Sequence, residues 1–167
     1  METSLRLAGD SKNLRIHAKE KLPLNSQTLL QAHGEIDTSS GAPSYLALII
    51  RRFYPELSAN IGVGVQLDGG NDFVYNVRGK KAFLITQTGR VGINIKGRCI
   101  GDKEFKLAKK SGAVELAWSI FNFQNDQDVR LKVGYEFFDK VPYFQLRENN
   151  WTLNACMNGK WNVRFDL

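Results

Sequence analysis

The stretch Val129-Arg130-Leu131-Lys132-Val133-Gly134-Tyr135-Glu136-Phe137 decides the fold, because apolar and polar side chains alternate strictly along it. A period of two places alternate side chains on opposite faces of a β-strand. Similar alternation recurs at residues 14–19, 91–98 and 160–165. A sheet that is apolar on one face and basic on the other predicts a barrel whose two faces meet different surroundings.

Turn signals divide the 167-residue chain into short segments. They fall at residues 10–13, 37–41, 54–56, 68–72, 86–90, 101–103, 109–112, 124–127, 138–140, 148–150 and 158–160. A transmembrane strand takes roughly 9 to 11 residues, so about twelve such strands use the whole chain. We therefore expect an all-β fold with one domain, residues 1–167: a transmembrane antiparallel β-barrel of about 12 short strands with short turns and no plug domain.

Alternation alone does not say which face points inward, because a soluble barrel also alternates, with its apolar face inside. Two features favour a membrane barrel over a soluble β-barrel that binds an anionic ligand. The breaks are more frequent than in a small soluble barrel of about eight longer strands. Aromatic residues also gather near expected strand ends, as in the girdles of membrane barrels. They are Phe53, Tyr54, Phe73, Phe121, Phe123, Phe137, Phe138, Tyr143, Trp151 and Trp161.

The polar face is strongly basic, which is the third feature that favours a membrane barrel and the main functional signal. Its expected cations are Arg15, Lys19, Lys21, Arg78, Lys80, Lys96, Arg98, Arg130, Lys132, Arg147, Lys160 and Arg164, against Glu35, Glu115, Glu136 and Asp166. Rings of Arg and Lys in a narrow pore attract phosphates and carboxylates and repel cations. We predict that these residues line the pore and bind anions, although a solvated outer surface would also carry charge.

The net charge of +6 agrees with a negatively charged partner. Nucleic acid is not the expected one, because the cations spread over most strands instead of forming a patch with interleaved aromatics. His17 and His33 have the polar parity of their strands, and we predict pH-sensitive lumen groups there. Cys99 and Cys156 lack metal-ligand spacing and are expected to be ordinary thiols. No catalytic arrangement, metal site or cofactor is indicated, so we do not expect an enzyme.

Several positions carry local expectations. Gly62 and Gly64 are expected to be small lumen-facing residues, and Gly69-Gly70-Asn71 to form a hairpin turn. Glu20 and Lys81 fall on the apolar face, where a charge at the bilayer midplane costs about 2 to 4 kcal/mol, so we predict a bulge or a rim location at each.

Both ends of the sequence also carry expectations. Residues 1–7 lack the features of a secretory signal or a cleavable transit peptide. Residues 161–167 form an alternating strand that suits barrel closure.

Blocks at both ends of the sequence resemble one known family. They are Met1-Glu-Thr-Ser-Leu-Arg6, Gly9-Asp-Ser-Lys12, Ile16-His-Ala-Lys-Glu-Lys-Leu22, Phe121-Asn-Phe-Gln124, Asp126-Gln-Asp-Val-Arg-Leu131, Gly134-Tyr-Glu136, Val141-Pro-Tyr143, Leu146-Arg-Glu-Asn-Asn-Trp-Thr152, Trp161-Asn-Val-Arg164 and Asp166-Leu167. Together they are similar to the plastid outer envelope pore protein 21 family, most weakly between about residues 66 and 112.

The resemblance implies an integral β-barrel of the plastid or chloroplast outer envelope membrane. It implies an anion-selective, rectifying channel for inorganic phosphate, triose phosphates and 3-phosphoglycerate, in which ATP and ADP bind in the pore and modulate it. Two departures from the family's expected pattern are Pro23 and His33, where further basic residues are expected. A histidine in place of a fixed charge could make selectivity depend on pH.

Overall fold

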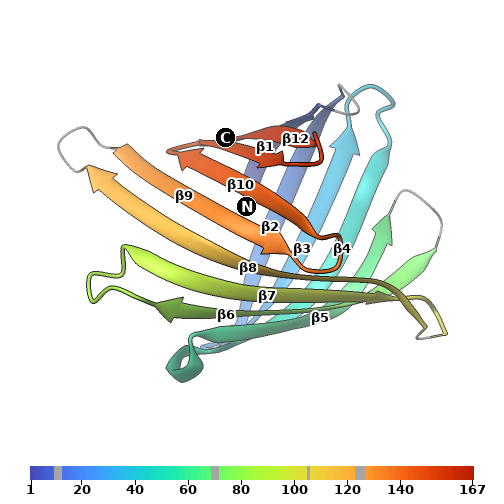
Figure 1. The fold of residues 1–167 in the computed structure, drawn as a ribbon. Coiled ribbons are helices and arrows are strands. Elements are labelled where there is room, and N and C mark those ends of the chain that lie inside the picture. Colours follow the sequence, from blue (N-terminus) through green and yellow to red (C-terminus); the bar gives the residue numbers. More distant parts are fainter. Residues whose placement is uncertain (10–12, 69–71, 105, 123–126) are drawn as a thin grey trace.

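Twelve antiparallel strands form a closed barrel in the computed structural model, which describes residues 1–9, 13–68, 72–104, 106–122 and 127–167 (Figure 1). The strands are β1 (Glu2–Ala8), β2 (Leu14–Asn25), β3 (Thr28–Asp37), β4 (Pro43–Tyr54), β5 (Ala59–Asp68), β6 (Phe73–Leu84), β7 (Val91–Gly101), β8 (Leu107–Asn122), β9 (Gln127–Glu136), β10 (Val141–Glu148), β11 (Trp151–Cys156) and β12 (Trp161–Asp166). Each strand pairs with the next along the chain, and β12 returns to β1. The predicted fold class is confirmed.

The one helix among the described residues is the single 3₁₀ turn η1 (Pro55–Leu57), so no plug helix occurs within those ranges. No helix in the described part of the chain is long and apolar enough to cross a membrane.

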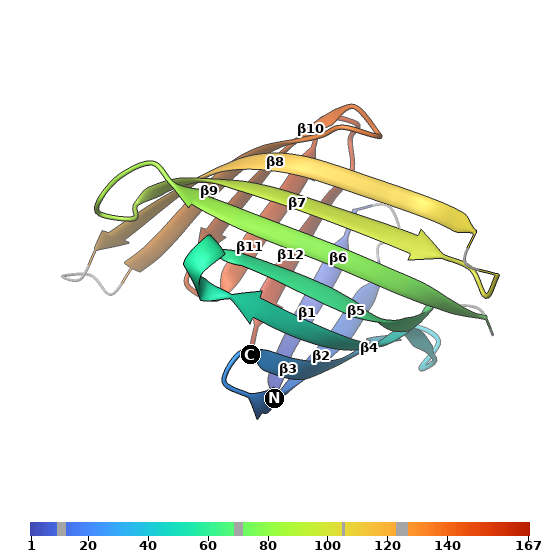
Figure 2. The same ribbon diagram turned by 90° about the horizontal axis from the view of Figure 1, so that it is seen from below.

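The two ends of the chain meet at the closing seam, and Figures 1 and 2 both show the termini side by side. The backbone N–H of Leu167 donates to the carbonyl of Thr3 at 3.0 Å, and Gly9 donates to Trp161 at 2.9 Å. This pairing leaves neither β1 nor β12 with an open sheet edge. The prediction of a closing C-terminal strand is confirmed.

The apolar face of the sheet points outward. Large side chains such as Leu48, Val63 and Trp118 are about half exposed on the outside of the barrel. The buried side chains are instead mostly polar: Ser4, His17, Gln31, Glu35, Gln66, Asn76, Asn94, Glu115 and Thr152. A soluble barrel has the opposite arrangement, with its apolar side chains inside, so the side-chain distribution favours the membrane barrel.

Two of the predicted breaks need correction. The turn expected at residues 109–112 is wrong, because β8 runs unbroken for 16 residues. Within it, the ammonium group of Lys110 lies 5.0 Å from the centre of the Phe138 ring. A turn at residues 25–28 was missed, where the Oδ1 of Asn25 accepts the backbone N–H of Gln27 at 2.9 Å. The two errors cancel in the strand count. The strands also vary more than expected, since β11 and β12 have only 6 residues each.

Some of the other expectations concern residues that the structure does not describe, and two concern the charged residues Glu20 and Lys81 on the apolar face. The turns expected at 10–13, 68–72 and 124–127 include undescribed residues, as do the Gly69-Gly70-Asn71 hairpin and Phe123. Of the two alternatives predicted for Glu20 and Lys81, a bulge or a rim location, the bulge is excluded, because the strand register is unbroken at both. Lys81 pairs with Ala59, the first residue of β5, and so lies near the barrel rim beside η1.

Gly62 and Gly64 do face the lumen, as predicted, and they make room for Ile49. A Cβ on Gly64 would lie 2.1 Å from the carbonyl oxygen of Leu48 and 2.7 Å from the Cα of Ile49. Ile49 is fully buried beneath these two glycines. The wall is therefore filled on this side by an aliphatic side chain instead of a polar one.

Candidate functional site in the barrel lumen

Strand register places five lumen arginines in one row across the closing seam. Arg130 pairs with Arg147 across β9 and β10, and Thr152 of β11 lies between Arg147 and Arg164 of β12. The row continues through Arg164, Arg6 and Arg15 on β12, β1 and β2. Directly paired residues of antiparallel strands have Cα atoms about 4.5 to 5.5 Å apart, so these cations are close neighbours. We call them the seam row: Arg130, Arg147, Arg164, Arg6 and Arg15.

Carboxylates lie beside the arginines of the seam row and reduce the electrostatic repulsion among them. Asp128 accepts two hydrogen bonds from Arg130, at 3.0 and 2.7 Å. Asp166 lies 2.6 Å from Arg164 and 3.6 Å from Arg147. The remaining two arginines share Glu35. Every arginine of the seam row therefore has a carboxylate within ion-pair distance.

A second row of arginines lies on the opposite stretch of wall and lacks such partners. Arg51 of β4 and Arg78 of β6 flank Gly62 of β5, and Arg78 pairs directly with Arg98 of β7. We call Arg51, Arg78 and Arg98 the second row. None of its members, nor the neighbouring Lys80, forms an ion pair with any described residue. Uncompensated positive charge is thus concentrated on β4 to β7.

The second row opens into a cavity of about 380 Å³. It is lined by Arg51, Asn60, Arg78, Gly79, Lys80, Lys96, Gly97, Arg98, Ser111, Gly112, Ala113 and Glu136. The carboxylate of Glu136 is engaged by the backbone, because it accepts the N–H of Gly112 at 2.7 Å. The cavity is therefore lined by five cations and one acid.

The two rows meet at a smaller cavity of about 270 Å³, here called the central cavity. It is lined by Arg6 and Arg15 of the seam row, Arg78 and Arg98 of the second row, and His33, Glu35, Ser44 and Tyr45. The Nε atoms of all four arginines are buried without a hydrogen-bond partner among the described residues. An anion in the cavity therefore meets four guanidinium charges and the single carboxylate of Glu35. A phosphate or carboxylate group has the opposite charge and the oxygen acceptors that guanidinium groups bind.

Hydrogen bonds to the buried side chain of Gln66 position Arg98 of the second row at the central cavity. The Oε1 atom of Gln66 accepts from Asn76 at 2.6 Å, from Tyr45 at 3.3 Å and from Arg98. Gln66 and Asn76 are almost fully buried. A guanidinium held by a buried amide is presented to the lumen in a fixed orientation.

A third cavity, of about 430 Å³, lies along the seam row. It is lined by Arg6, Arg130, Lys132, Gln145, Arg147, Thr152, Asn154, Asn162, Arg164 and Asp166. Its amide side chains form a chain in which Gln145 donates to Asn154 at 2.5 Å and Asn154 donates to Asn162 at 2.8 Å. Amides and cations together suit the oxygen-rich surface of a phosphorylated metabolite.

Tyr143 departs from the expectation that it belongs to an aromatic girdle, because its side chain lies in the lumen. Its hydroxyl donates to Glu115 at 2.7 Å, and Lys96 donates to the same oxygen at 2.6 Å. The ring reaches Glu115 by lying across Gly134, where a Cβ would be only 2.3 Å from the ring. Glycine at 134 is therefore required by this contact, which the alternating pattern did not reveal.

Both histidines lie on the lumen side. The rings of His17 and His33 are 4.1 Å apart, and His33 is 4.8 Å from the ring of Tyr45. The hydroxyl of Ser4 lies 3.4 Å from the Nδ1 of His17. His33 also lines the central cavity, so its charge state would act on any anion there. Their pH sensitivity stays a prediction.

Most of the predicted pore-lining cations have lumen-facing positions in the strands. In the three cavities described above, the structure places Arg15, Arg78, Lys80, Lys96, Arg98, Arg130, Lys132, Arg147 and Arg164. Lys19 and Lys21 instead form ion pairs with Glu2 near the start of β1. Lys160 is exposed in the turn before β12, away from these cavities. Both Cys99 and Cys156 are free.

Sequence reasoning missed Arg6 and Arg51. Arg6 carries the same signal as the others, since it alternates with Leu5 and Leu7. Arg51 was obscured because it ends the apolar run 45–50, in which Ala47 and Ile49 occupy lumen-facing positions. An apolar residue on the lumen face breaks the alternation that identifies the face.

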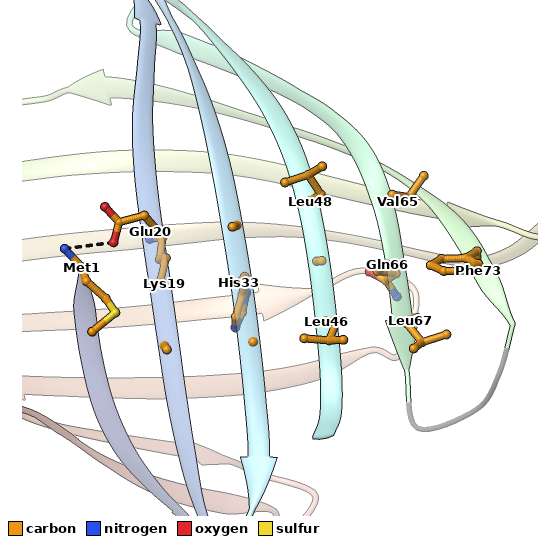
Figure 3. A pocket seen from close by; sticks show the side chains of 14 residues that line it. Met1, Lys19, Glu20, His33, Leu46, Leu48, Val65, Gln66, Leu67 and Phe73 are labelled. Atoms are coloured by element: carbon orange, nitrogen blue, oxygen red, sulfur yellow. Dashed lines mark ion pairs between the residues drawn. The ribbon is translucent and has the colours of Figure 1, made fainter. Parts of the chain in front are cut away.

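A further hollow, of about 410 Å³, lies on the outside of the barrel (Figure 3). Small residues on β2 and β3, namely Ala18, Ala32 and Gly34, leave it open, and outward-facing leucines on β4 and β5 wall it. Figure 3 shows the amino group of Met1 paired with Glu20 at its edge, at 3.1 Å. This hollow is almost entirely apolar and is separate from the lumen.

Comparison with known proteins agrees with this geometry. The family described as "Chloroplast outer envelope pore protein OEP21" matches residues 3–167. The chain belongs to the chloroplast outer envelope pore protein 21 family. Outer envelope pore protein 21A of Arabidopsis thaliana is 54% identical over 167 residues, and outer envelope pore protein 21 of Pisum sativum is 52% identical over 177 residues. In both comparisons all of each chain is covered.

A solved structure supports the fold of the outer envelope pore protein 21 family member described here. The KdgM porin aligns with 99% of this chain and 96% of its own, with a TM-score of 0.61 and 10% sequence identity. At that identity the likeness concerns the fold alone. Membership of this family of outer envelope pore proteins indicates a channel.

Proposed function

We propose that this protein is an anion-selective, rectifying channel of the plastid outer envelope that passes phosphorylated metabolites. The permeant species are inorganic phosphate, triose phosphates and 3-phosphoglycerate, and ATP and ADP bind in the pore and modulate it. The observation that carries the proposal is the central cavity, where four arginines from opposite walls face a single carboxylate, that of Glu35. Such a site attracts anions and repels cations without any catalytic step.

The excess of cations over acids supports the direction of selectivity. In the cavity of the second row, five cations face one carboxylate that is already bonded to the backbone, and of the five Lys96 alone forms an ion pair with a described residue, Glu115. A cation entering this space meets positive charge from β4, β6 and β7, whereas a phosphate finds several charge-assisted donors. ATP carries more charge than a triose phosphate, so it should bind the same arginines more tightly and leave more slowly. It then reduces the current at concentrations where smaller anions still pass.

Solute flux into proteoliposomes tests the proposal. Vesicles containing the native protein are expected to take up inorganic phosphate and 3-phosphoglycerate faster than a cationic solute of similar size. The double variant Arg78→Gln with Arg98→Gln should lose most of that preference. Its control is Arg52→Gln with Lys81→Gln, which removes the same charge from outward-facing positions. Equal uptake of anions and cations by the native protein would contradict the proposal.

A further inference from the structure

Glu35 is a carboxylate held inside the basic lumen. Its Oε1 atom lies 3.1 Å from Arg15, and its Oε2 atom lies 3.6 Å from Arg6. The side chain is only 8% exposed and lines the central cavity beside the four arginines. A fixed carboxylate therefore occupies the kind of position that the carboxylate or phosphate of a solute would take.

A strand irregularity holds Glu35 in this place. The register of β3 and β4 shifts between Glu35 and Ile36, and the consecutive residues Ser44 and Tyr45 both line the central cavity. A bulge redirects a side chain in this way. The hydroxyl of Ser44 lies 3.3 Å from both the backbone carbonyl and the Oε1 of Glu35. The carboxylate is thus anchored from its own hairpin while it faces Arg6 and Arg15 on β1 and β2.

The neighbouring arginines show that Glu35 compensates only part of the charge. Glu35 contacts Arg6 and Arg15, whereas Arg78 and Arg98 across the cavity form no ion pair with any described residue. One acid among four arginines leaves the cavity attractive to anions but lowers the number of free donors.

We propose that Glu35 is a specificity-determining residue that competes with passing anions for Arg6 and Arg15. This inference rests on the proposed anion-channel function and adds the regulation of its central site. A pore must bind an ion well enough to admit it and weakly enough to release it. By occupying two of the four guanidinium groups, Glu35 keeps nucleotide binding weak enough for the smaller anions to pass.

Single-channel recording in planar bilayers, with ATP as the probe, tests this role in the variant Glu35→Gln. The amide keeps the size of the side chain and an acceptor for Ser44, but it frees Arg6 and Arg15 from a negative charge. A charge-assisted hydrogen bond gained by ATP corresponds to about a tenfold or greater fall in the half-blocking concentration. The matched control is Glu136→Gln, which removes a lumen carboxylate that bonds to the backbone of Gly112 and not to an arginine.

A double-mutant cycle separates competition from a general change in lumen charge. In an Arg6→Gln, Arg15→Gln background, the Glu35→Gln change is expected to alter ATP block less than twofold, because the cations for which it competes are gone. If Glu35→Gln alone does not fold, Glu35→Asp takes its place: the shorter side chain keeps the charge but withdraws the carboxylate from Arg6 and Arg15, so ATP block should strengthen, and unchanged block would overturn the inference.

The outcomes distinguish the inference from the function on which it rests. Stronger ATP block in Glu35→Gln, but not in Glu136→Gln, supports competition. An anion-selective native pore in which Glu35→Gln is unchanged, or is matched by Glu136→Gln, overturns the inference alone. A native pore with no anion preference overturns both.

Discussion

Arg51 and Arg52 are adjacent in β4 but project to opposite faces of the barrel wall. Arg51 lines the cavity of the second row, whereas Arg52 is exposed on the outside and lies 5.5 Å above the ring of Tyr54. Arg51→Gln and Arg52→Gln therefore remove the same charge from neighbouring positions. If the basic face lines the conduction path, only the first substitution should change the response to anions.

The magnitude follows from the position of each side chain. Arg51 can contact an anion directly, and a hydrogen bond to a charged group contributes about 1.5 to 3 kcal/mol, or about a ten- to hundredfold change in affinity. Arg52 is separated from the lumen by the sheet. Across roughly 10 Å with water-like screening, the interaction of two unit charges is about 0.4 kcal/mol, which corresponds to about a twofold change.

The assay is the concentration of ATP that halves the chloride current in planar bilayers at 0.1 M salt. Arg51→Gln is expected to raise this concentration at least tenfold, and Arg52→Gln to change it no more than twofold. Equal shifts in the two variants would refute the assignment of faces. Matching single-channel conductance in symmetric salt would show that both variants still form open barrels.

Three further predictions address other parts of the lumen. Replacing both Arg130 and Lys132 by glutamine should weaken anion preference and ATP block together, as measured by reversal potential and half-blocking concentration; if neither changes, those side chains do not line the pore. Because four arginines line the central cavity with His33 and oppose a further positive charge there, anion permeability should change little between pH 6 and pH 8 in both the native protein and His33→Ala; a fall in the native protein that His33→Ala abolishes would contradict this and support the pH sensitivity expected from the sequence. Gly134→Ala should reduce the stability to urea unfolding by about 1 to 3 kcal/mol, because the new methyl group overlaps the ring of Tyr143; a variant as stable as the native protein would show that the ring does not cross β9.

The alternating pattern predicted the barrel well because each strand has one apolar and one polar face. The parity of Arg130, Lys132 and Arg164 gave their lumen-facing positions directly, since side-chain direction follows from position in a strand. The strand count was also predicted, although one predicted turn was wrong and another turn was missed. Residues 109–112 look like a turn by composition, yet they remain within β8, where Lys110 contacts the ring of Phe138 and Ser111 lines the lumen.

What the sequence did not reveal depends on contacts between strands distant along the chain. Neither the two arginine rows nor their meeting at the central cavity follows from parity alone, because both depend on strand register and barrel closure. The pairing of Glu35 with Arg6 and Arg15 needs β1, β2 and β3 in their observed register. Tyr143 was expected at the membrane interface because of its aromatic ring, whereas its hydroxyl determines its place beside Glu115.

The most direct test of anion selectivity is the reversal potential of the native protein in a planar bilayer. It is measured under a tenfold KCl gradient, before and after addition of ATP. A basic lumen predicts a value close to the chloride equilibrium potential, about 59 mV in magnitude for a monovalent ion, with the current reduced by ATP. A value of the opposite sign, near the potassium equilibrium potential, would show that the basic face does not govern conduction.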